Sequence, residues 1–378
     1  MKTKMEINSS ALHSPYIIDG VRQSVTPAQI LAGVSIYPVD AQIGVEIPPI
    51  VDETPDVDPG PVALDPRKVD KYLAAVHKTE RQIPMAFAGT YTRNRIACTL
   101  IDCIWKMGHF RIGDLSLDAQ WRWNNLRLGN AAGFYRSVEA MGEALDALDI
   151  RLRDFDFFVS EGPCELKLSA DVRPCSPDED LVEQPYTTVN PHIGVAGIAG
   201  NFLPDEQSWI IYIPFDSSPY RLGGSLLAQA LDINPPLEPQ SLDSDYFIDC
   251  FEVVRELVED GIVLAGATVG EGGLLPALKS MASPRAGALL DISDLKRAWA
   301  DTDITSLLFA EIPGVVIQIR DIDFDYIDAE LLLQDVAFYP LGHPVLNGGA
   351  VRVKSSAKTG IQNILASLVQ RQGGEGED

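Results

Sequence analysis

Apolar runs alternate with amphipathic segments along the second half of the chain. A short apolar run is typical of a buried strand, whereas apolar residues three and four positions apart are typical of one face of a helix. Such an alternation predicts a strand-rich α/β or α+β domain. The pattern predicts helices at 224–231, 245–259 and 274–281, and strands at 193–198, 209–215, 262–265, 289–292, 315–319 and 351–353.

The first half of the chain contains one very clear helix, at 133–148. Its residues Phe134, Val138, Met141 and Leu145 recur at spacings of four, three and four, which places them on one helix face. Residues 47–68 are rich in proline and acidic residues, so we expect a loop or linker there. The pattern also predicts helices at 69–78 and 93–107 and strands at 16–19, 34–45 and 155–159.

A proline-rich and acidic stretch at 173–191 predicts a domain boundary. We expect one domain at 16–185 and a second at 190–355, which a chain of 378 residues accommodates comfortably. Residues 1–15 are expected to be disordered. Residues 356–378 are expected to form a helical end and a disordered tail, because the last residues lack apolar side chains.

Charge and cysteine content narrow the function classes. The 30 basic residues against 54 acidic ones give a formal net charge of -24, which argues against binding to nucleic acid or to anionic membrane surfaces. The five cysteines are scattered and form no CxxC pair, so neither a disulfide framework nor a zinc site is expected. No basic start precedes an early apolar run, and we expect a cytoplasmic protein.

Two glycine turns are the candidate binding elements. Gly272 and Gly273 follow a predicted strand and open a predicted helix, where backbone N–H groups and the helix dipole favour an anion such as phosphate. Gly223, Gly224 and Ser225 stand in the same relation to the preceding strand and the next helix. A tight turn without a ligand explains either glycine pair equally well, because glycine adopts turn conformations readily.

Several segments resemble one enzyme family in the right order along the chain. They include RIGDLSLDAQW at 111–121, RLGGSLLAQAL at 221–231 and LLFAEIPGVVIQI at 307–319. The series resembles the C-terminal half of the large-type phosphoribosylformylglycinamidine synthase and, more broadly, the aminoimidazole-ribonucleotide-synthetase-like superfamily. The resemblance implies an N-terminal mixed-sheet domain and a C-terminal α/β domain. It also implies ATP-dependent amidation of formylglycinamide ribonucleotide in purine nucleotide biosynthesis, with ATP and Mg²⁺ as cofactors.

The chain departs from the family where acids and cations are required. The family's His-Asp-x-Ser-Asp-Gly-Gly signature falls on residues 267–273, where Glu271 is the one remaining acid. Its metal-facing Glu and Asn fall on Leu100 and Ile104, and Asp40 matches a strand aspartate. The resemblance therefore leaves Asp40 and Glu271 as metal contacts and identifies no catalytic residue. The function stays open between a synthase-like protein of doubtful catalysis and an inactive pseudoenzyme with a structural or regulatory role.

The resemblance also bears on partners and on two acidic motifs. The large synthases carry a homologous first half and a glutaminase without counterparts here, so we expect a homodimer or a first-half homologue as partner, with a purine-pathway nucleotide as ligand. Glu311 matches a family glutamate and is expected to be a salt-bridge partner. Asp321, Asp323 and Asp325 alternate with apolar residues, which predicts a solvent-exposed strand edge rather than a calcium loop.

Overall fold

The structure, a computed structural model, describes residues 10–41, 47–57, 66–75, 82–124, 127–172, 198–232, 243–346 and 349–354. The chain divides into two compact units. Unit 1 comprises Met1–Asp58, Glu80–Cys103 and Phe110–Thr187, and unit 2 comprises Pro59–Thr79, Ile104–His109 and Thr188–Asp378. Within the described ranges, no helix is long and apolar enough to cross a membrane.

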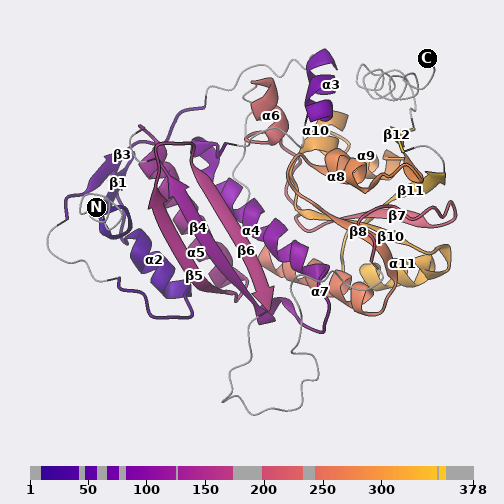
Figure 1. The fold of residues 1–378 in the computed structure, drawn as a ribbon, viewed down its shortest axis with the longest axis horizontal. Helices are drawn as coiled ribbons and strands as arrows, with labels where there is room; N and C mark the ends of the chain where they lie inside the picture. The colour runs from indigo at the N-terminus through magenta and orange to yellow at the C-terminus, as the bar shows by residue number, and fades with distance from the viewer. Residues whose placement is uncertain are drawn as a thin grey trace, which may run out of the picture. The chain divides into compact units, whose positions relative to one another are not determined.

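The described part of unit 1 contains two three-stranded sheets and three helices of eight or more residues (Figure 1). The first sheet has the order β2-β1-β3 and the second the order β5-β4-β6, in which β4 runs parallel to β5 and antiparallel to β6. The elements are β1 (Tyr16–Ile18), β2 (Val21–Arg22), α2 (Pro27–Val34), β3 (Ile50–Asp52), η2 (Met85–Phe87), α4 (Ala88–Ile104), η3 (Ile112–Asp114), β4 (Leu115–Trp123), α5 (Asn130–Ala147), β5 (Arg151–Val159) and β6 (Glu165–Val172).

The core of unit 1 forms between the β5-β4-β6 sheet and helix α5. Alternate residues of β4 point to opposite faces of the sheet, and Trp121 and Trp123 are fully buried on one of them. Phe134 of α5 lies between these two indoles and Phe157 of β5, with ring centroids 4.6–6.2 Å apart. Helices α4 and α5 lie on the same side of the sheet (Figure 1). This aromatic cluster fixes the helix on the sheet.

The N-terminus of α5 is capped by an acid from a distant strand. Asp52 ends β3 and accepts hydrogen bonds from the N–H groups of Gly129 (2.8 Å), Ala131 (2.9 Å) and Ala132 (3.0 Å). The N-cap residue itself, Gly129, has no side chain to supply a cap. Asp52 therefore both satisfies free helix donors and places a negative charge at the positive end of the helix dipole.

Unit 2 is built on one six-stranded mixed sheet with the order β12-β9-β11-β7-β10-β8. Helices α8, α9 and α10 lie on one side of this sheet, and α7 and α11 lie on the other (Figure 1). The elements are α3 (Pro66–Ala75), β7 (Trp209–Pro214), α6 (Leu226–Leu231), α7 (Ser244–Glu259), β8 (Val263–Val269), α8 (Leu274–Met281), β9 (Ala286–Leu290), α9 (Ser293–Ala298), α10 (Ile304–Phe309), β10 (Gly314–Ile319), η4 (Asp321–Asp323), α11 (Phe324–Leu333), β11 (Tyr339–Leu346) and β12 (Val351–Val353).

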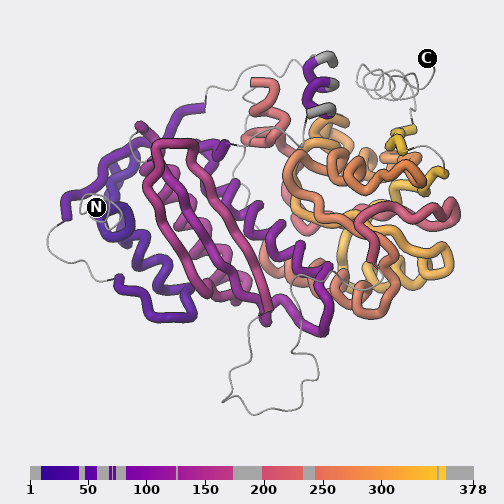
Figure 2. The backbone as a smooth tube through the Cα atoms, viewed as in Figure 1, coloured from indigo at the N-terminus to yellow at the C-terminus, as the bar shows by residue number. Residues whose placement is uncertain are grey.

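Two segments from the first half of the sequence complete unit 2. Helix α3 lies beside α6 (Figure 2), and its Tyr72 packs edge-on against Phe309 at a ring distance of 5.9 Å. Trp105 covers β8 at Gly266, where a Cβ would lie 2.5 Å from the indole ring. Its Nε1 donates to Thr268 Oγ1 at 3.0 Å. The early segments are therefore part of the packing of this unit.

A fully buried arginine anchors the second of these segments. The Arg255 side chain is 1% exposed, and its guanidinium donates to the carbonyl oxygens of Ile104 (2.8 Å) and Gly108. Its Nε lies 3.2 Å from Glu259, which also lies 2.7 Å from His109 Nδ1. A buried charge is tolerated when it is paired and hydrogen-bonded in this way.

Most of the predicted regular elements are confirmed, and so is the mixed α/β class. The strand at 34–45 is wrong: the residues described there end helix α2 and make one isolated bridge, from Ser35 to Leu152. The loop at 47–68 contains strand β3, and the predicted strand edge at Asp321–Asp325 is a helical segment. Residues 10–13, inside the terminus expected to be disordered, are helical. The strand at 193–198 lies almost entirely outside the described residues, and the boundary near 185–190, the helical end and the tail lie wholly outside them.

Candidate functional site

Three adjacent strands of the unit 2 sheet, β7, β10 and β8, have ends that lie side by side at the same end of the sheet. Strand β10 begins at Gly314, which pairs with Pro214 at the end of β7 and with Val269 at the end of β8. The loops that follow β7 and β8 and the loop that precedes β10 therefore leave the sheet at the same place. Both glycine turns predicted from the sequence follow these strand ends, so the structure brings them together.

Glu311 connects the two glycine turns. Its Oε1 accepts a hydrogen bond from the N–H of Gly272 at 2.9 Å and another from the N–H of Leu226 at 2.9 Å. The side chain lies in the loop before β10, and the residue is 9% exposed. A carboxylate of this chain thus occupies the point at which N–H groups of both turns converge, as an anion does at a helix N-terminus.

The Gly272–Gly273 turn is closely packed. Gly273 has a φ of +87°, and a Cβ on it would lie 2.7 Å from the carbonyl carbon of Phe309 and 2.8 Å from the oxygen of Ala310. Its N–H donates to the carbonyl of Gly270 at 2.9 Å. Both the conformation and the close backbone approach therefore require glycine here.

Replacing Gly273 by alanine is expected to lower the free energy of unfolding of unit 2 by about 3 kcal/mol, because the methyl group adds a clash with rigid backbone to an unfavourable φ. Gly261→Ala is the matched control: Gly261 has a φ of +69°, but a Cβ there meets nothing within 4 Å. Its expected cost is about 1 kcal/mol, from conformation alone. Equal costs in calorimetric unfolding would contradict the role of the close approach.

The second predicted turn, at Gly223–Ser225, is also closed by a hydrogen bond within its own backbone. Ser225 N donates to the carbonyl of Leu222 at 3.0 Å across Gly223 and Gly224, and Gly224 has a φ of +68°. The Ser225 hydroxyl accepts from the N–H of Ala228 at 3.2 Å and caps the short helix α6. The serine predicted to bind phosphate thus acts as a helix cap in this structure.

A second buried acid at this edge was not identified from the sequence. Asp216 follows β7, is 3% exposed and accepts from the N–H of Ser218 at 2.8 Å. Burial, opposed by the hydrogen bonds from Ser218, raises the pKa of this carboxyl, and the negative charge of Asp243 adds to the increase. An acid directly after an apolar strand was the sequence signal for it.

The two predicted metal contacts lie in different units. Asp40 is an exposed residue that follows α2 in unit 1, and Glu271 is an exposed residue of the glycine turn in unit 2. Among the residues that the structure describes, no group of three or more His, Cys, Asp or Glu side chains is placed to hold a metal ion. Leu100 and Ile104, which the sequence resemblance aligns with metal-facing residues of the family, are fully buried.

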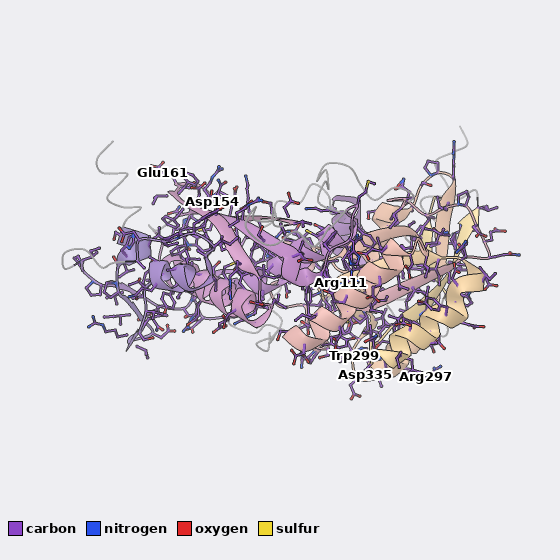
Figure 3. The ribbon with its side chains drawn as sticks, turned by 90° about the horizontal axis from the view of Figure 1, so that it is seen from below. Arg111, Asp154, Glu161, Arg297, Trp299 and Asp335 are labelled. Carbon is purple, nitrogen blue, oxygen red and sulfur yellow. The ribbon has the colours of Figure 1, made fainter. Side chains whose placement is uncertain are left out.

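The face of the β5-β4-β6 sheet opposite α5 is polar and carries a hollow of about 800 Å³. In this hollow, Arg153 donates hydrogen bonds to both carboxylate oxygens of Asp118. Asp154, the next residue of β5, is exposed to solvent (Figure 3). The lining residues of the hollow are Tyr37, Asp118, Ala119, Gln120, Arg153, Asp154, Phe155, Asp156, Lys167, Leu168 and Ser169. The hollow therefore has both charges but no dominant sign.

Comparison with curated proteins finds phosphoribosylformylglycinamidine synthases among the sequences similar to this chain. The chain is 27% identical over 217 residues to human phosphoribosylformylglycinamidine synthase, a match that covers 56% of this chain and 15% of the human protein. It is 25% identical over 272 residues to the Drosophila melanogaster enzyme, covering 67% and 19%. The resemblance predicted from the sequence is thereby confirmed, and it spans less than a fifth of these relatives.

Solved structures show more distant likenesses. The Thermotoga maritima PurLQS structure matches 72% of this chain and 41% of that chain, with 12% identity and a TM-score of 0.49. A structure of the hydrogenase maturation protein HypE in complex with ATP matches 70% of this chain and 76% of that chain, with 14% identity and a TM-score of 0.46. No protein-family profile matches the chain.

Proposed function

Because the chain is a sequence relative of the phosphoribosylformylglycinamidine synthases, we propose that it acts in purine nucleotide biosynthesis as a synthase-like subunit. It contributes the folded scaffold of such a synthase rather than the ATP-dependent amidation itself. The observation that supports a scaffold without amidation activity is the position of Glu311. Its carboxylate accepts hydrogen bonds from N–H groups of both turns, which a nucleotide phosphate would otherwise use.

The two residues that stand where the resemblance places a metal-facing Glu and Asn support the scaffold role. Leu100 of unit 1 and Ile104, which is assigned to unit 2, are both fully buried, so both stabilise the fold by burying apolar surface. An aliphatic side chain cannot coordinate Mg²⁺, which takes oxygen ligands. The packing motifs of the family are thus kept, while two positions that would face the metal are occupied by buried aliphatic side chains.

The described residues do not fit ATP–Mg²⁺ at the predicted site. A phosphate at the Gly272–Gly273 turn would compete with Glu311 for the N–H of Gly272, and its negative charge would lie beside that carboxylate. The N–H of Gly273 is also engaged, by the carbonyl of Gly270.

The second candidate is a nucleotide-binding synthase with activity of its own. It is favoured by the convergence of both glycine turns at one sheet edge, where ligands bind in many open α/β sheets. In this case ATP phosphates would lie near Gly224 and Gly272, and Asp40 or Glu271 would contact Mg²⁺. A homodimer or a first-half synthase homologue would complete the site, through a surface such as the polar open face of the β5-β4-β6 sheet.

Thermal unfolding with ligands separates the two candidates. A scaffold is expected to show the same midpoint with and without millimolar ATP–Mg²⁺ or formylglycinamide ribonucleotide, and no release of ADP. Binding to the native state alone would add about 2.7 kcal/mol at a ligand concentration one hundred times Kd, which raises the midpoint by several degrees. An active synthase measured in parallel is the positive control. A concentration-dependent rise, or ammonia-dependent ADP release by the purified chain, would overturn the scaffold role.

A further inference from the structure

Helix α11 exposes an apolar stripe that no described element covers. Its inner face is formed by Ile327 and Leu331, which are fully buried. On the opposite face of α11, Tyr326 and Leu333 are 49% and 77% exposed, and Ile322 of the preceding turn η4 is 83% exposed. Together with Ala329 they recur at spacings of four, three and four residues, which is the spacing of one helix face. The solvent-facing side of a surface helix normally carries polar residues. An exposed apolar patch on such a helix indicates an interaction surface.

Acidic residues surround this stripe. Partial desolvation raises the pKa of Tyr326, and so do the nearby carboxylates of Glu330, Asp260 and Glu256. The last two belong to the end of α7, so two elements contribute acids to this surface. The remaining acids of the segment are Asp321, Asp323, Asp325, Asp328 and Asp335, the last of which is labelled in Figure 3.

The C-terminal part of the sequence has the complementary pattern. In a chain of net charge -24, residues 354–374 contain Lys354, Lys358 and Arg371 and no acid. Five apolar residues within this stretch have the spacing i, i+3, i+4, i+7, i+8 of a helix with one apolar face. They are Ile361, Ile364, Leu365, Leu368 and Val369.

We propose that residues 361–369 of the same chain form a helix that docks its apolar face on the exposed stripe of α11, with the flanking cations near the surrounding acids. The described chain reaches Lys354 next to β12, in the same unit as α11. The six residues 355–360 span about 20 Å when extended. Strand β12 is two positions from β11 in the sheet, about 10 Å, and β11 directly follows α11.

Hydrogen exchange of the full chain, followed by mass spectrometry, tests the docking. Amides of residues 361–369 are expected to exchange at least about tenfold more slowly than in an unstructured peptide. Leu333→Lys on α11 is expected to remove most of this protection, although it changes a residue far from the segment in sequence. Leu128→Lys is the matched control, because Leu128 is 82% exposed and lies in unit 1, and it should leave the protection unchanged.

Three results would overturn the proposal. Unprotected amides at 361–369 in the unchanged chain would show that the segment does not dock. Protection that survives Leu333→Lys would place the segment on another surface. Protection that falls on dilution, together with a halved mass in light scattering, would assign the stripe to a second copy instead of the same chain.

Discussion

Glu311→Ala is expected to lower the free energy of unfolding of unit 2 by about 3 kcal/mol. The substitution leaves the N–H groups of Gly272 and Leu226 without their acceptor in a buried place, and each such loss costs about 1–3 kcal/mol. It also removes the contact that joins two turns from distant parts of the chain. Calorimetric or urea unfolding measures the change directly.

Two variants make the Glu311 result specific. Glu311→Gln keeps an oxygen acceptor and loses only the charge, so its expected cost is smaller, about 1 kcal/mol. Glu271→Ala changes an exposed glutamate of the neighbouring turn and should stay within about 0.5 kcal/mol. If Glu311 serves as the anion of this site, added phosphate or formate should raise the midpoint of Glu311→Ala and leave the unchanged chain unaffected. Equal costs for Glu311→Ala and Glu271→Ala would contradict this role.

Asp52→Ala is expected to destabilise unit 1 by about 3 kcal/mol. The Asp52 carboxylate accepts hydrogen bonds from three N–H groups at the start of α5. Loss of a helix cap alone costs about 1 kcal/mol. Loss of charge-assisted bonds from buried donors adds to that cost. The change should appear as a lower unfolding midpoint of unit 1, with the aromatic cluster around Phe134 exposed earlier on heating.

The same helix provides the control for Asp52. Asp146 lies near the C-terminus of α5, where a negative charge is unfavourable to the helix dipole, and its side chain is 81% exposed. Asp146→Ala should therefore be neutral or slightly stabilising. A cost below about 1 kcal/mol for Asp52→Ala would show that water replaces the carboxylate at the helix N-terminus without loss.

Elements with a sustained period were predictable from the sequence, and short ones were not. Helix α5 was identified from the spacing of Phe134, Val138, Met141 and Leu145, all of which are buried. Strand β3 has three residues inside a proline-rich segment, so no period develops there. In η4 and α11 the alternation of Asp321, Asp323 and Asp325 imitates a strand for five residues, and the helical spacing of the buried residues Ile327 and Leu331 comes only after it.

The two glycine turns of the candidate site were predictable from the sequence, but their connection through Glu311 was not. Strand-to-helix turns with paired glycines indicate an anion site, and both turns lie at one sheet edge. That Glu311 joins them depends on contacts across 85 and 39 residues, which no local pattern specifies. The sequence alone predicted a salt bridge for Glu311, because a carboxylate that enters a strand often has a charged partner, and it gave no sign of these two backbone donors. The separation of Asp40 and Glu271 into two units is likewise a property of the folded chain.

Unit 2 is assembled from three separate stretches of the sequence, which restricts how the gene can be divided or recombined. A single cut near residue 190 would separate Arg255 from the carbonyls of Ile104 and Gly108 and would remove Trp105 from Gly266. The guanidinium would then lose both carbonyl acceptors and keep its ion pair with Glu259. Descendants of this protein are therefore expected to keep or lose unit 2 only together with the segments 59–79 and 104–109, because the reading frame after residue 187 does not encode a complete unit 2.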